Sequence, residues 1–306
     1  MIPTHDCAPY LRHTLTSVLA QDPGRELMQI EVIDDASSDR PEAVVEELGR
    51  GRVSFFRQPR NVGHVANFNT CLERSRGRLV HLLHGDDCVR DGFYAAMGRL
   101  LETEPAAGAA FCRYIAIDEQ GDWSSIAALE QRSAGLIPDW LERIAVGQRL
   151  QTPCMVVRRE VYEQLGGFDA RGGFAEDWEM WVRIAARHPV AYEPQPLALY
   201  RVHTLSRTGR MVRTGENVRD LRRVIAINRG QFPPDQADEI ARRALRETAT
   251  TCLRRARRLL GAGDTAAMWA QVREAVRSDA SPRVLAEAAV VVAARYVLAL
   301  RSGRAP

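Results

Sequence analysis

The chain has 306 residues, of which 45% are hydrophobic and 26% are charged, a composition typical of a soluble globular protein with one large or two smaller domains. The formal net charge at pH 7 is only +3, which argues against a surface built for nucleic acid. All 42 basic residues are arginine, and the lack of lysine excludes Walker A kinases, pyridoxal-phosphate Schiff bases and a lysine general base.

The six cysteines are scattered, with no C-x-x-C pair, which predicts neither a zinc site nor a disulfide framework. We therefore expect reduced thiols and a cytoplasmic protein. The N-terminal stretch Met1–Tyr10 lacks the charged and apolar regions of a signal peptide. No run of about 18 uncharged apolar residues predicts a membrane span.

Strands and helices alternate along the first two thirds of the chain. This pattern predicts an α/β fold with a Rossmann-like, mostly parallel central sheet and flanking helices. Short apolar runs predict strands at 1–4, 29–33, 53–57, 79–83, 109–117, 153–158, 190–192 and 197–202. Helical periodicity predicts helices at 8–20, 41–48, 65–74, 92–103, 138–146, 159–165 and 178–188. The polar stretch 119–135 is predicted to be a loop.

Strand signals stop near Gly215, and the rest of the sequence predicts helices at 234–260, 265–277 and 283–300. We therefore predict two domains, residues 1–214 and an α-helical C-terminal region, residues 215–306. The helix at 234–260 is rich in arginine. A solvated helix face is one interpretation of this basic run, and contact with an anionic membrane surface is another. The basic residues are Arg242, Arg243, Arg246, Arg254, Arg255, Arg257 and Arg258.

Two adjacent carboxylates, Asp86 and Asp87, follow the predicted strand at 79–83 and the turn at Gly85. Ligands of open α/β sheets bind outside the carboxyl ends of strands. Carboxylate pairs there suit Mg²⁺ or Mn²⁺, which in turn hold phosphate oxygens. A polar turn without any ligand is the simpler interpretation of the same three residues. His84 is a third candidate ligand, with a structural role as its alternative.

Three further polar positions have two interpretations each. Asp35, after the second strand, could accept a hydrogen bond from a base or a ribose, or could stabilise a turn. Glu176 and Asp177 precede a helix and could supply a general base, or could serve only as favourable N-terminal acids. His203 follows an apolar strand and could contact a pyrophosphate, or could lie at a plain sheet edge.

Taken in order, these motifs resemble glycosyltransferase family 2, the inverting enzymes with a GT-A fold. The resemblance covers about residues 1–205, and each motif is weak alone but specific in combination. The matching segments are Ile2–Asp6 with Tyr10-Leu11 and Ser17–Gln21, Val32–Asp39, Asn61–Gly63 with Asn67, Gly85–Asp87, Gly166–Asp169, Glu176–Trp178 and Tyr200–His203.

The resemblance implies transfer of a sugar, with inversion, from a nucleotide-diphosphate donor to an acceptor hydroxyl. It implies UDP as the nucleotide and Mn²⁺ or Mg²⁺ as the cofactor. The acceptor would be a saccharide or a lipid-linked molecule of cell-surface polysaccharide or glycoconjugate synthesis. No nucleic-acid partner is expected. The implied nucleotide-sugar ligands are Thr4, Asp6, Asp35, Asn61, Gly63, Asp86 and His203. Asp86, Asp87 and His203 would bind the metal, and Asp177, with Glu176 beside it, would be the catalytic base.

One departure from the family pattern is His84, which stands where the D-x-D motif has its first aspartate. Metal binding would then depend on Asp86, and the expected result is either a lower metal affinity or a preference for Mn²⁺ over Mg²⁺. Two other functions stay open: a non-catalytic nucleotide-sugar-binding paralogue and a sugar nucleotidyltransferase. The second typically has a Gly-rich, basic first loop, which His5–Pro9 is not. The oligomeric state stays open as well.

Overall fold

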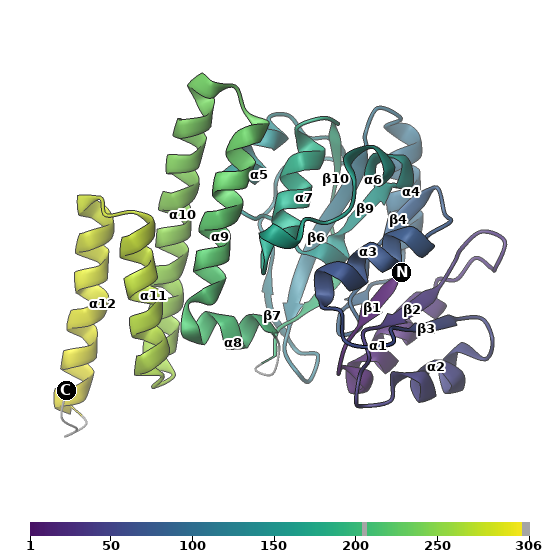
Figure 1. Ribbon diagram of the computed structural model, residues 1–306, viewed down its shortest axis with the longest axis horizontal. Coiled ribbons are helices and arrows are strands. Elements are labelled where there is room, and N and C mark those ends of the chain that lie inside the picture. Colours follow the sequence, from purple (N-terminus) through teal and green to yellow (C-terminus); the bar gives the residue numbers. More distant parts are fainter. Residues whose placement is uncertain (204–206, 302–306) are drawn as a thin grey trace. The chain divides into compact units, whose positions relative to one another are not determined.

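The computed structural model describes residues 1–203 and 207–301, which form two compact units (Figure 1). The first unit comprises Met1–Trp140, Arg149–Ala170 and Arg183–Val202. The second comprises Leu141–Gln148, Arg171–Val182 and the chain from His203 onward. The predicted boundary between residues 214 and 215 assumes that each domain is one continuous stretch of sequence. The second unit instead combines the C-terminal stretch with two segments from the middle of the chain.

Strands of the first unit form two hydrogen-bonded sheets. A parallel sheet has the order β1-β2-β3, with β1 at Ile2–Thr4, β2 at Glu31–Asp34 and β3 at Ser54–Arg57. A mixed sheet has the order β4-β9-β6-β10-β5. The bounds of its strands are Leu79–His81 for β4, Met155–Arg158 for β9, Ala109–Ile117 for β6, Val190–Arg201 for β10 and Cys88–Val89 for β5. The amides of Leu83 and Gly85 donate to the carbonyls of Met1 and Pro3, so the chain after β4 continues the first sheet beyond β1.

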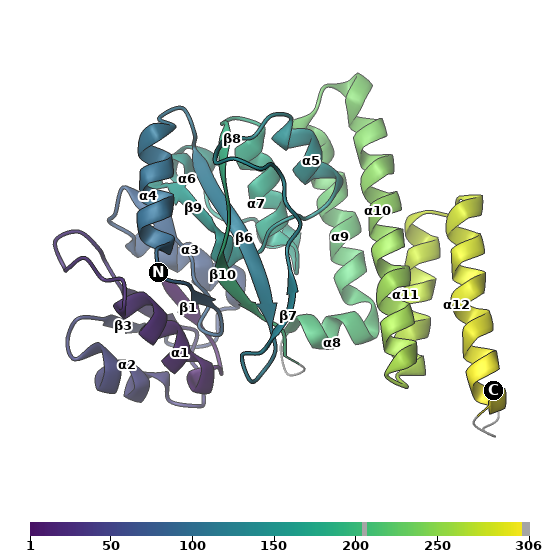
Figure 2. The same ribbon diagram turned by 180° about the vertical axis from the view of Figure 1, so that it is seen from behind.

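Helices flank these strands, as the apolar periodicity predicts (Figures 1 and 2). In α1, Leu11, Leu15 and Val18 recur on one helix face and are buried. Pro41 occupies the first turn of α2, where its missing N–H costs no helical hydrogen bond. The helices of this unit are α1 (Ala8–Leu19), α2 (Pro41–Gly49), α3 (His64–Arg74), α4 (Phe93–Thr103) and α6 (Arg159–Leu165). Two helices contribute to both units, α5 (Trp140–Val146) and α7 (Glu176–Ala185).

The α/β class is confirmed, and the pairing within the larger sheet is mixed. β6 and β10 are parallel, whereas β9 and β5 run antiparallel to their neighbours. The predicted loop at 119–135 contains a short strand, β7 (Trp123–Ile126), and a second, β8 (Gly135–Leu136), begins at its last residue. Two predicted strands, at 190–192 and 197–202, are one strand, β10, whose register shifts around Pro196. Proline lacks the N–H that a regular ladder requires, so such irregularities are where it occurs in sheets.

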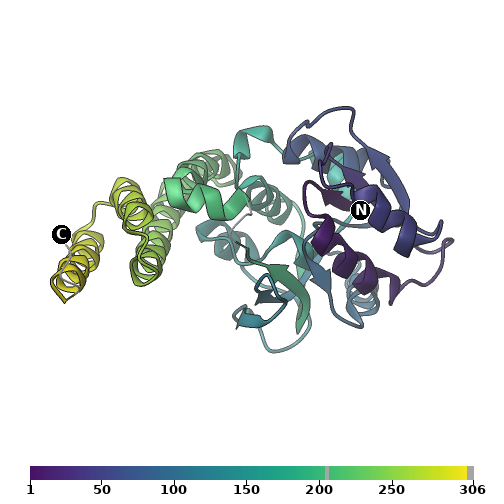
Figure 3. The ribbon, with the colours of Figure 1, turned by 90° about the horizontal axis from the view of Figure 1, so that it is seen from below.

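The second unit has a helical core. Its long helices, α9 (Glu216–Asn228), α10 (Pro234–Gly261), α11 (Thr265–Ser278) and α12 (Pro282–Arg301), lie side by side and are seen nearly end-on in Figure 3. The short helix α8 (Arg207–Thr214) precedes them. The three helices predicted after residue 233 are confirmed, and α8 and α9 were not predicted. Small and aliphatic side chains fill the core, among them Val218, Ala249, Cys252, Leu253, Ala256, Met268, Val272, Ala275, Val284 and Val291.

The arginine-rich helix α10 is largely charge-compensated. Five of its seven basic residues named above form ion pairs with carboxylates: Arg242, Arg243, Arg246, Arg254 and Arg257. Its uncompensated positive charge is therefore much lower than the sequence suggests. Among the helices within 1–203 and 207–301, none combines the length and apolarity that crossing a bilayer requires.

Candidate active site

The loop after β4 lies against the N-terminal strand at a distance that only glycine permits. A Cβ atom on Gly85 would lie 2.7 Å from the Oγ1 of Thr4 and 2.8 Å from the Sγ of Cys7. From α1, the buried hydroxyl of Thr14 lies 3.0 Å from the carbonyl oxygen of Gly85 and 2.7 Å from that of Asp87. These contacts fix the backbone of the loop that carries the two carboxylates.

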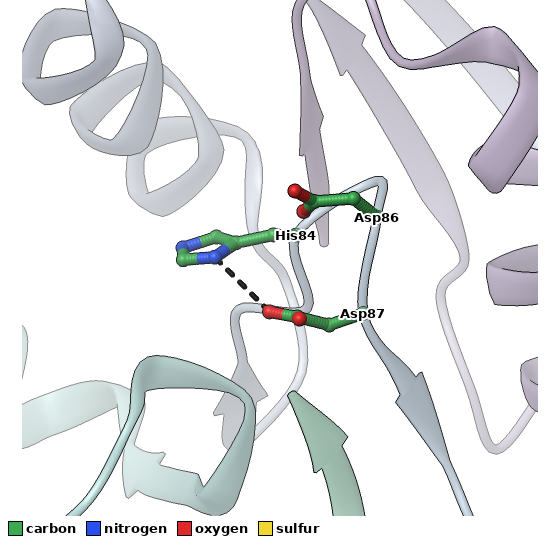
Figure 4. A group of neighbouring side chains, drawn as sticks. All are labelled: His84, Asp86 and Asp87. Carbon is green, nitrogen blue, oxygen red and sulfur yellow. Dashed lines mark ion pairs between the residues drawn. The ribbon is translucent and has the colours of Figure 1, made fainter. Parts of the chain in front are cut away.

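His84, Asp86 and Asp87 form a compact cluster on this loop, and their side chains project to the same side of it (Figure 4). One potential ligand atom from each lies within 4.8 Å of the others. The Nδ1 of His84 lies 3.2 Å from Oδ2 of Asp87, which is buried. Burial, followed by the negative charge of Asp86, raises the pKa of Asp87 to about 6.

The donor set of this cluster fits a divalent cation. Two carboxylates and one imidazole suit Mn²⁺, and carboxylates alone suit Mg²⁺. Burial, followed by the charge of Asp86, raises the pKa of Asp87, and a bound cation would compensate the two adjacent carboxylates. The structure thus groups His84 with the two aspartates.

Arg201, the last residue of β10, also holds this loop to the sheet. Its backbone N–H donates to Oδ1 of Asp87 at 2.8 Å, and its Nε donates to the carbonyl of Asp86 at 2.9 Å. Its Nη1 donates to the carbonyl of Asp118 at 2.8 Å. The guanidinium lies 4.8 Å from the ring centroid of Tyr10, and the residue is buried. The Nε and Nη1 of Arg201 therefore donate to carbonyls of the protein backbone.

Five predicted nucleotide ligands gather at the carboxyl ends of β1 and β2: Thr4, Asp6, Asp35, Asn61 and Gly63. The amide of Asp35 donates to the carbonyl of Thr4. Buried Asp35 accepts from the amides of Val62 at 2.6 Å and Gly63 at 3.0 Å, so its carboxylate shapes the loop that contains Asn61.

Asp6 faces solvent on the same side of the first unit. It accepts from the amide of Ser38 at 2.7 Å, and this bond holds its pKa below the usual value. Asn61 lies nearby, with its Nδ2 3.1 Å from Nε2 of His5. These partly exposed polar groups can meet a ligand without a large desolvation cost.

Glu176 and Asp177 lie in the second unit, on the first turn of α7, and both are buried. Asp177 accepts from Nε2 of Gln148 at 2.8 Å and from the amide of Trp178 at 2.7 Å. The indole N–H of Trp178 donates to the carbonyl of Ile144, which ties α7 to α5. A carboxylate at this end of a helix is stabilised as the anion, the form that a general base requires.

The glycine-rich turn before α7 is held by α9. The amide of Phe174 donates to Oδ2 of Asp220 at 2.9 Å. Gly173 has a φ of +64°, and a Cβ atom there would lie 2.4 Å from the same oxygen. The position therefore requires glycine, both for its backbone conformation and for the close approach of Asp220. His203, the remaining predicted ligand, also belongs to the second unit.

A family model described as "Glycosyl transferase family 2" matches residues 1–166, which is more than half of the chain. The chain belongs to glycosyltransferase family 2. The resemblance proposed from the motifs is thereby confirmed, and the protein is a glycosyltransferase. The matched stretch contains the cluster at Asp86 and ends before Glu176 and Asp177.

Relatives of this family 2 member include uncharacterised mycobacterial proteins. MT1568 of Mycobacterium tuberculosis is 28% identical over 235 residues, which are 73% of this chain and 73% of that protein. Three other mycobacterial relatives, Rv1520 of M. tuberculosis among them, are 27% identical over 202 residues, and the match spans only 55% of their length.

Solved structures confirm the GT-A fold. TarS 1-349 from S. aureus in complex with UDP-GlcNAc has a TM-score of 0.68 at 16% identity, covering 99% of this chain and 91% of that one. The mannosyltransferase PcManGT from Pyrobaculum calidifontis, in complex with GDP-Man and Mn²⁺, has a TM-score of 0.59 at 19% identity, covering 98% and 79%.

Three residues of the site were not identified from the sequence. Arg201 appeared only within the matching segment Tyr200–His203, and Thr14 and Gln148 were not singled out. Thr14 had one available signal, a polar residue within the apolar stripe of α1. Gln148 had none, because its partner Asp177 is 29 residues away in the sequence.

Proposed function

We propose that this glycosyltransferase moves a sugar, with inversion, from a UDP-linked donor to an acceptor hydroxyl. The observation that carries the proposal is the His84–Asp86–Asp87 cluster, held by Arg201 at the end of β10 in a family 2 fold. The donor class has support from two proteins of the same fold, solved with UDP-GlcNAc and with GDP-Man and Mn²⁺.

In this proposal Asp86, Asp87 and His84 hold a divalent cation, Mn²⁺ or Mg²⁺, which when bound neutralises charge on the departing diphosphate. Arg201 keeps the two carboxylates in place through the backbone of their loop. His203, which the family resemblance adds to the metal and diphosphate ligands, remains a prediction.

The nucleotide is proposed to lie against Thr4, Asp6, Asp35, Asn61 and Gly63. Both carboxylate oxygens of Asp35 already accept a backbone amide. Each such oxygen has a second lone pair, so Asp35 retains the capacity to accept from the imide N–H of uracil. Cytosine lacks that N–H, and recognition through Asp35 would therefore favour UDP over CDP.

Asp177 is proposed as the general base. Its carboxylate takes the proton of the acceptor hydroxyl as that oxygen forms a bond to the anomeric carbon. The bond from the anomeric carbon to the diphosphate oxygen breaks in the same displacement, which inverts the configuration. Gln148 orients the carboxylate. Glu176 precedes it on the same helical turn and is retained as an accessory acid.

Replacing the base tests this assignment. Asp177→Asn keeps the shape of the side chain and removes the proton acceptor, so kcat should fall about 10²- to 10⁴-fold with little change in the KM for the donor. Asp235→Asn is a matched control, because Asp235 is an exposed acid on the first turn of α10 in the same unit. Near-wild-type kcat in Asp177→Asn would refute the assignment.

Calorimetry of UDP binding tests the cation site. We expect Mn²⁺ to strengthen UDP binding to the wild type and not to Asp86→Asn, and we expect a chelator to remove the effect. An unchanged UDP affinity in the presence of the chelator would exclude a cation site at Asp86. Release of pyrophosphate from UTP and a sugar phosphate would instead identify a nucleotidyltransferase, and UDP binding without hydrolysis or transfer would identify a non-catalytic paralogue.

The cellular setting is part of the same proposal: a cytoplasmic enzyme of cell-surface polysaccharide or glycoconjugate synthesis with a saccharide or lipid-linked acceptor. The six free, buried cysteines accord with a reducing compartment. Five ion pairs on α10 reduce the positive charge that would attract an anionic membrane, and they argue against peripheral membrane contact through this helix. Sedimentation with anionic liposomes tests it, and equal recovery with and without liposomes would defeat it.

A further inference from the structure

The hairpin between β6 and β7 lies beside the loop that carries Asp86. One guanidinium, that of Arg201, joins the two: its Nε donates to the carbonyl of Asp86 and its Nη1 to that of Asp118. Asp118 directly follows β6, whose carboxyl end lies level with that of β10. The hairpin therefore occupies the edge of the sheet at which α/β folds bind their ligands.

Trp123, the first residue of β7, lies on the same face of the sheet as Arg201. Arg201 pairs with Ile117 across β10 and β6, and Ile117 pairs with Trp123 across β6 and β7. Directly paired residues point to the same face. With about 4.8 Å between neighbouring strands, Trp123 lies about 10 Å from Arg201 along the sheet. A short oligosaccharide spans that distance.

A β-bulge gives Trp123 a neighbour on this face. Ile126 pairs with Ile115, and the register shifts by one residue before Trp123 pairs with Ile117. Residues three apart on a regular strand point to opposite faces, but the bulge puts Trp123 and Ile126 on the same one. Bulges are common next to active sites, where they re-aim a side chain.

Both side chains are exposed, Trp123 to 60% and Ile126 to 49%. Grouped apolar side chains on a surface mark binding sites more often than chance exposure does. The guanidinium carbon of Arg90 lies 5.4 Å from the ring centroid of Trp123, which orients the indole. Ser125 pairs with Ala116 and therefore lies on the opposite face, and the hydroxyl of Ser124 donates to the carbonyl of Ala116. The surface therefore combines a flat apolar ring with the neighbouring guanidinium of Arg90.

We propose that Trp123 and Ile126 form the acceptor wall of the enzyme, on which a sugar ring of the acceptor saccharide stacks. The inference rests on the proposed function, since only a transferase has an acceptor. A sugar ring has an apolar C–H face bordered by hydroxyl groups, and this matches an exposed indole beside a guanidinium, which can donate to such hydroxyls. A lipid chain would instead require apolar surface that continues beyond the strand, toward exposed Leu129.

Saturation-transfer NMR tests the wall, with methyl β-glycosides of glucose, galactose and N-acetylglucosamine as probes and with UDP and Mn²⁺ present. We expect the wild type to saturate ring protons of at least one glycoside. Trp123→Ala should weaken that binding about tenfold, as expected for loss of an aromatic contact, and Trp123→Phe should retain part of it. Trp269→Ala is the control, because Trp269 is a 40% exposed tryptophan on α11 of the other unit.

Three outcomes would overturn the acceptor wall: no glycoside signal with the wild type, equal signals from Trp123→Ala and Trp269→Ala, or binding of phosphatidylglycerol vesicles that both Trp123→Ala and Leu129→Ser abolish. UDP binding, measured separately, distinguishes this failure from a wrong function. A wild type that does not bind UDP with Mn²⁺ refutes the proposed function. A Trp123→Ala variant that binds UDP normally while losing the glycoside supports the wall.

Discussion

Gln148 acts on the candidate base through a single hydrogen bond. Its amide donates to Oδ2 of Asp177 at 2.8 Å, which favours the ionised carboxylate and fixes its orientation. In Gln148→Leu the carboxylate should hold its proton more tightly. We therefore expect the acid limb of the kcat pH profile to move to higher pH, with the donor KM unchanged.

The profile is measured from about pH 5 to 9, a range that brackets the usual working pH of a general base. Gln131→Leu is the control, because the Gln131 amide donates to the carbonyls of Ser133, Gly135 and Leu136 in the first unit. If Gln148→Leu lowers activity equally at all pH values and does not shift the acid limb of the kcat profile, Gln148 has only a structural role.

Gly85 determines how closely the carboxylate loop approaches β1. The Cβ of Gly85→Ala would lie 2.7 Å from Oγ1 of Thr4, so the loop must shift. We expect Mn²⁺-dependent UDP affinity to fall at least tenfold, with a stability loss of about 1–3 kcal/mol from overpacking. Calorimetry and thermal melting measure the two effects.

Gly98→Ala is the matched control for Gly85→Ala. Gly98 lies within α4, and no atom lies within 4 Å of its added Cβ. This substitution should stabilise the helix by up to about 1 kcal/mol and leave UDP affinity unchanged. Equal UDP affinity in both alanine variants would show that the loop tolerates displacement.

At the scale of the elements, α9 and α11 are joined by a buried ion pair. Arg222 donates to Glu274 at 2.7 Å, and Arg277 donates to the same carboxylate. Burial opposes ionisation of Glu274, but the hydrogen bonds from these arginines outweigh it and hold its pKa below the usual value. The pair therefore stabilises the fold above the ordinary glutamate pKa, and this stability is lost as the pH falls through the lowered value.

Arg222→Leu would leave Glu274 buried with one partner fewer. We expect a loss of about 3 kcal/mol at pH 7, and a smaller loss near pH 4, where the carboxyl group is increasingly protonated. Urea denaturation at both pH values measures this. Arg229→Leu breaks an exposed pair with Asp238 and should cost about 0–1 kcal/mol at either pH. Equal losses from the two substitutions would contradict the argument.

The periodicity of apolar residues predicted those helices and strands in which the apolar side chains are the buried ones. The stripe Leu11, Leu15 and Val18 indicated α1, and the carboxylates after two strands indicated the edge where the site lies. β7 was not predicted because all its residues are exposed and a bulge interrupts the alternation of side chains between the two faces. The roles of Thr14 and Arg201 in holding the carboxylate loop were not predicted, because their hydrogen-bond partners lie 73 and 114 residues away in the sequence. Local periodicity carries no information about such distant partners.

For the whole molecule, the nucleotide candidates other than His203 all lie in the first unit. UDP with Mn²⁺ should therefore slow amide exchange at Val62, Gly63 and the Asp86 loop, because a ligand suppresses local opening where it binds. Amides in the core of α10 and α11 should exchange as before. Hydrogen–deuterium exchange with mass spectrometry measures both, and protection confined to the helical unit would contradict the assignment.

The chain passes between the two units five times, at residues 140/141, 148/149, 170/171, 182/183 and 202/203. A recombination event that exchanged only the stretch after residue 203 would separate α9 from the turn that Asp220 holds, and would separate α10 from Glu142, the partner of Arg243. The helical region is therefore not a detachable cassette. We expect natural or engineered chimaeras of this enzyme to fold only when residues 141–148 and 171–182 come from the same parent as the helices.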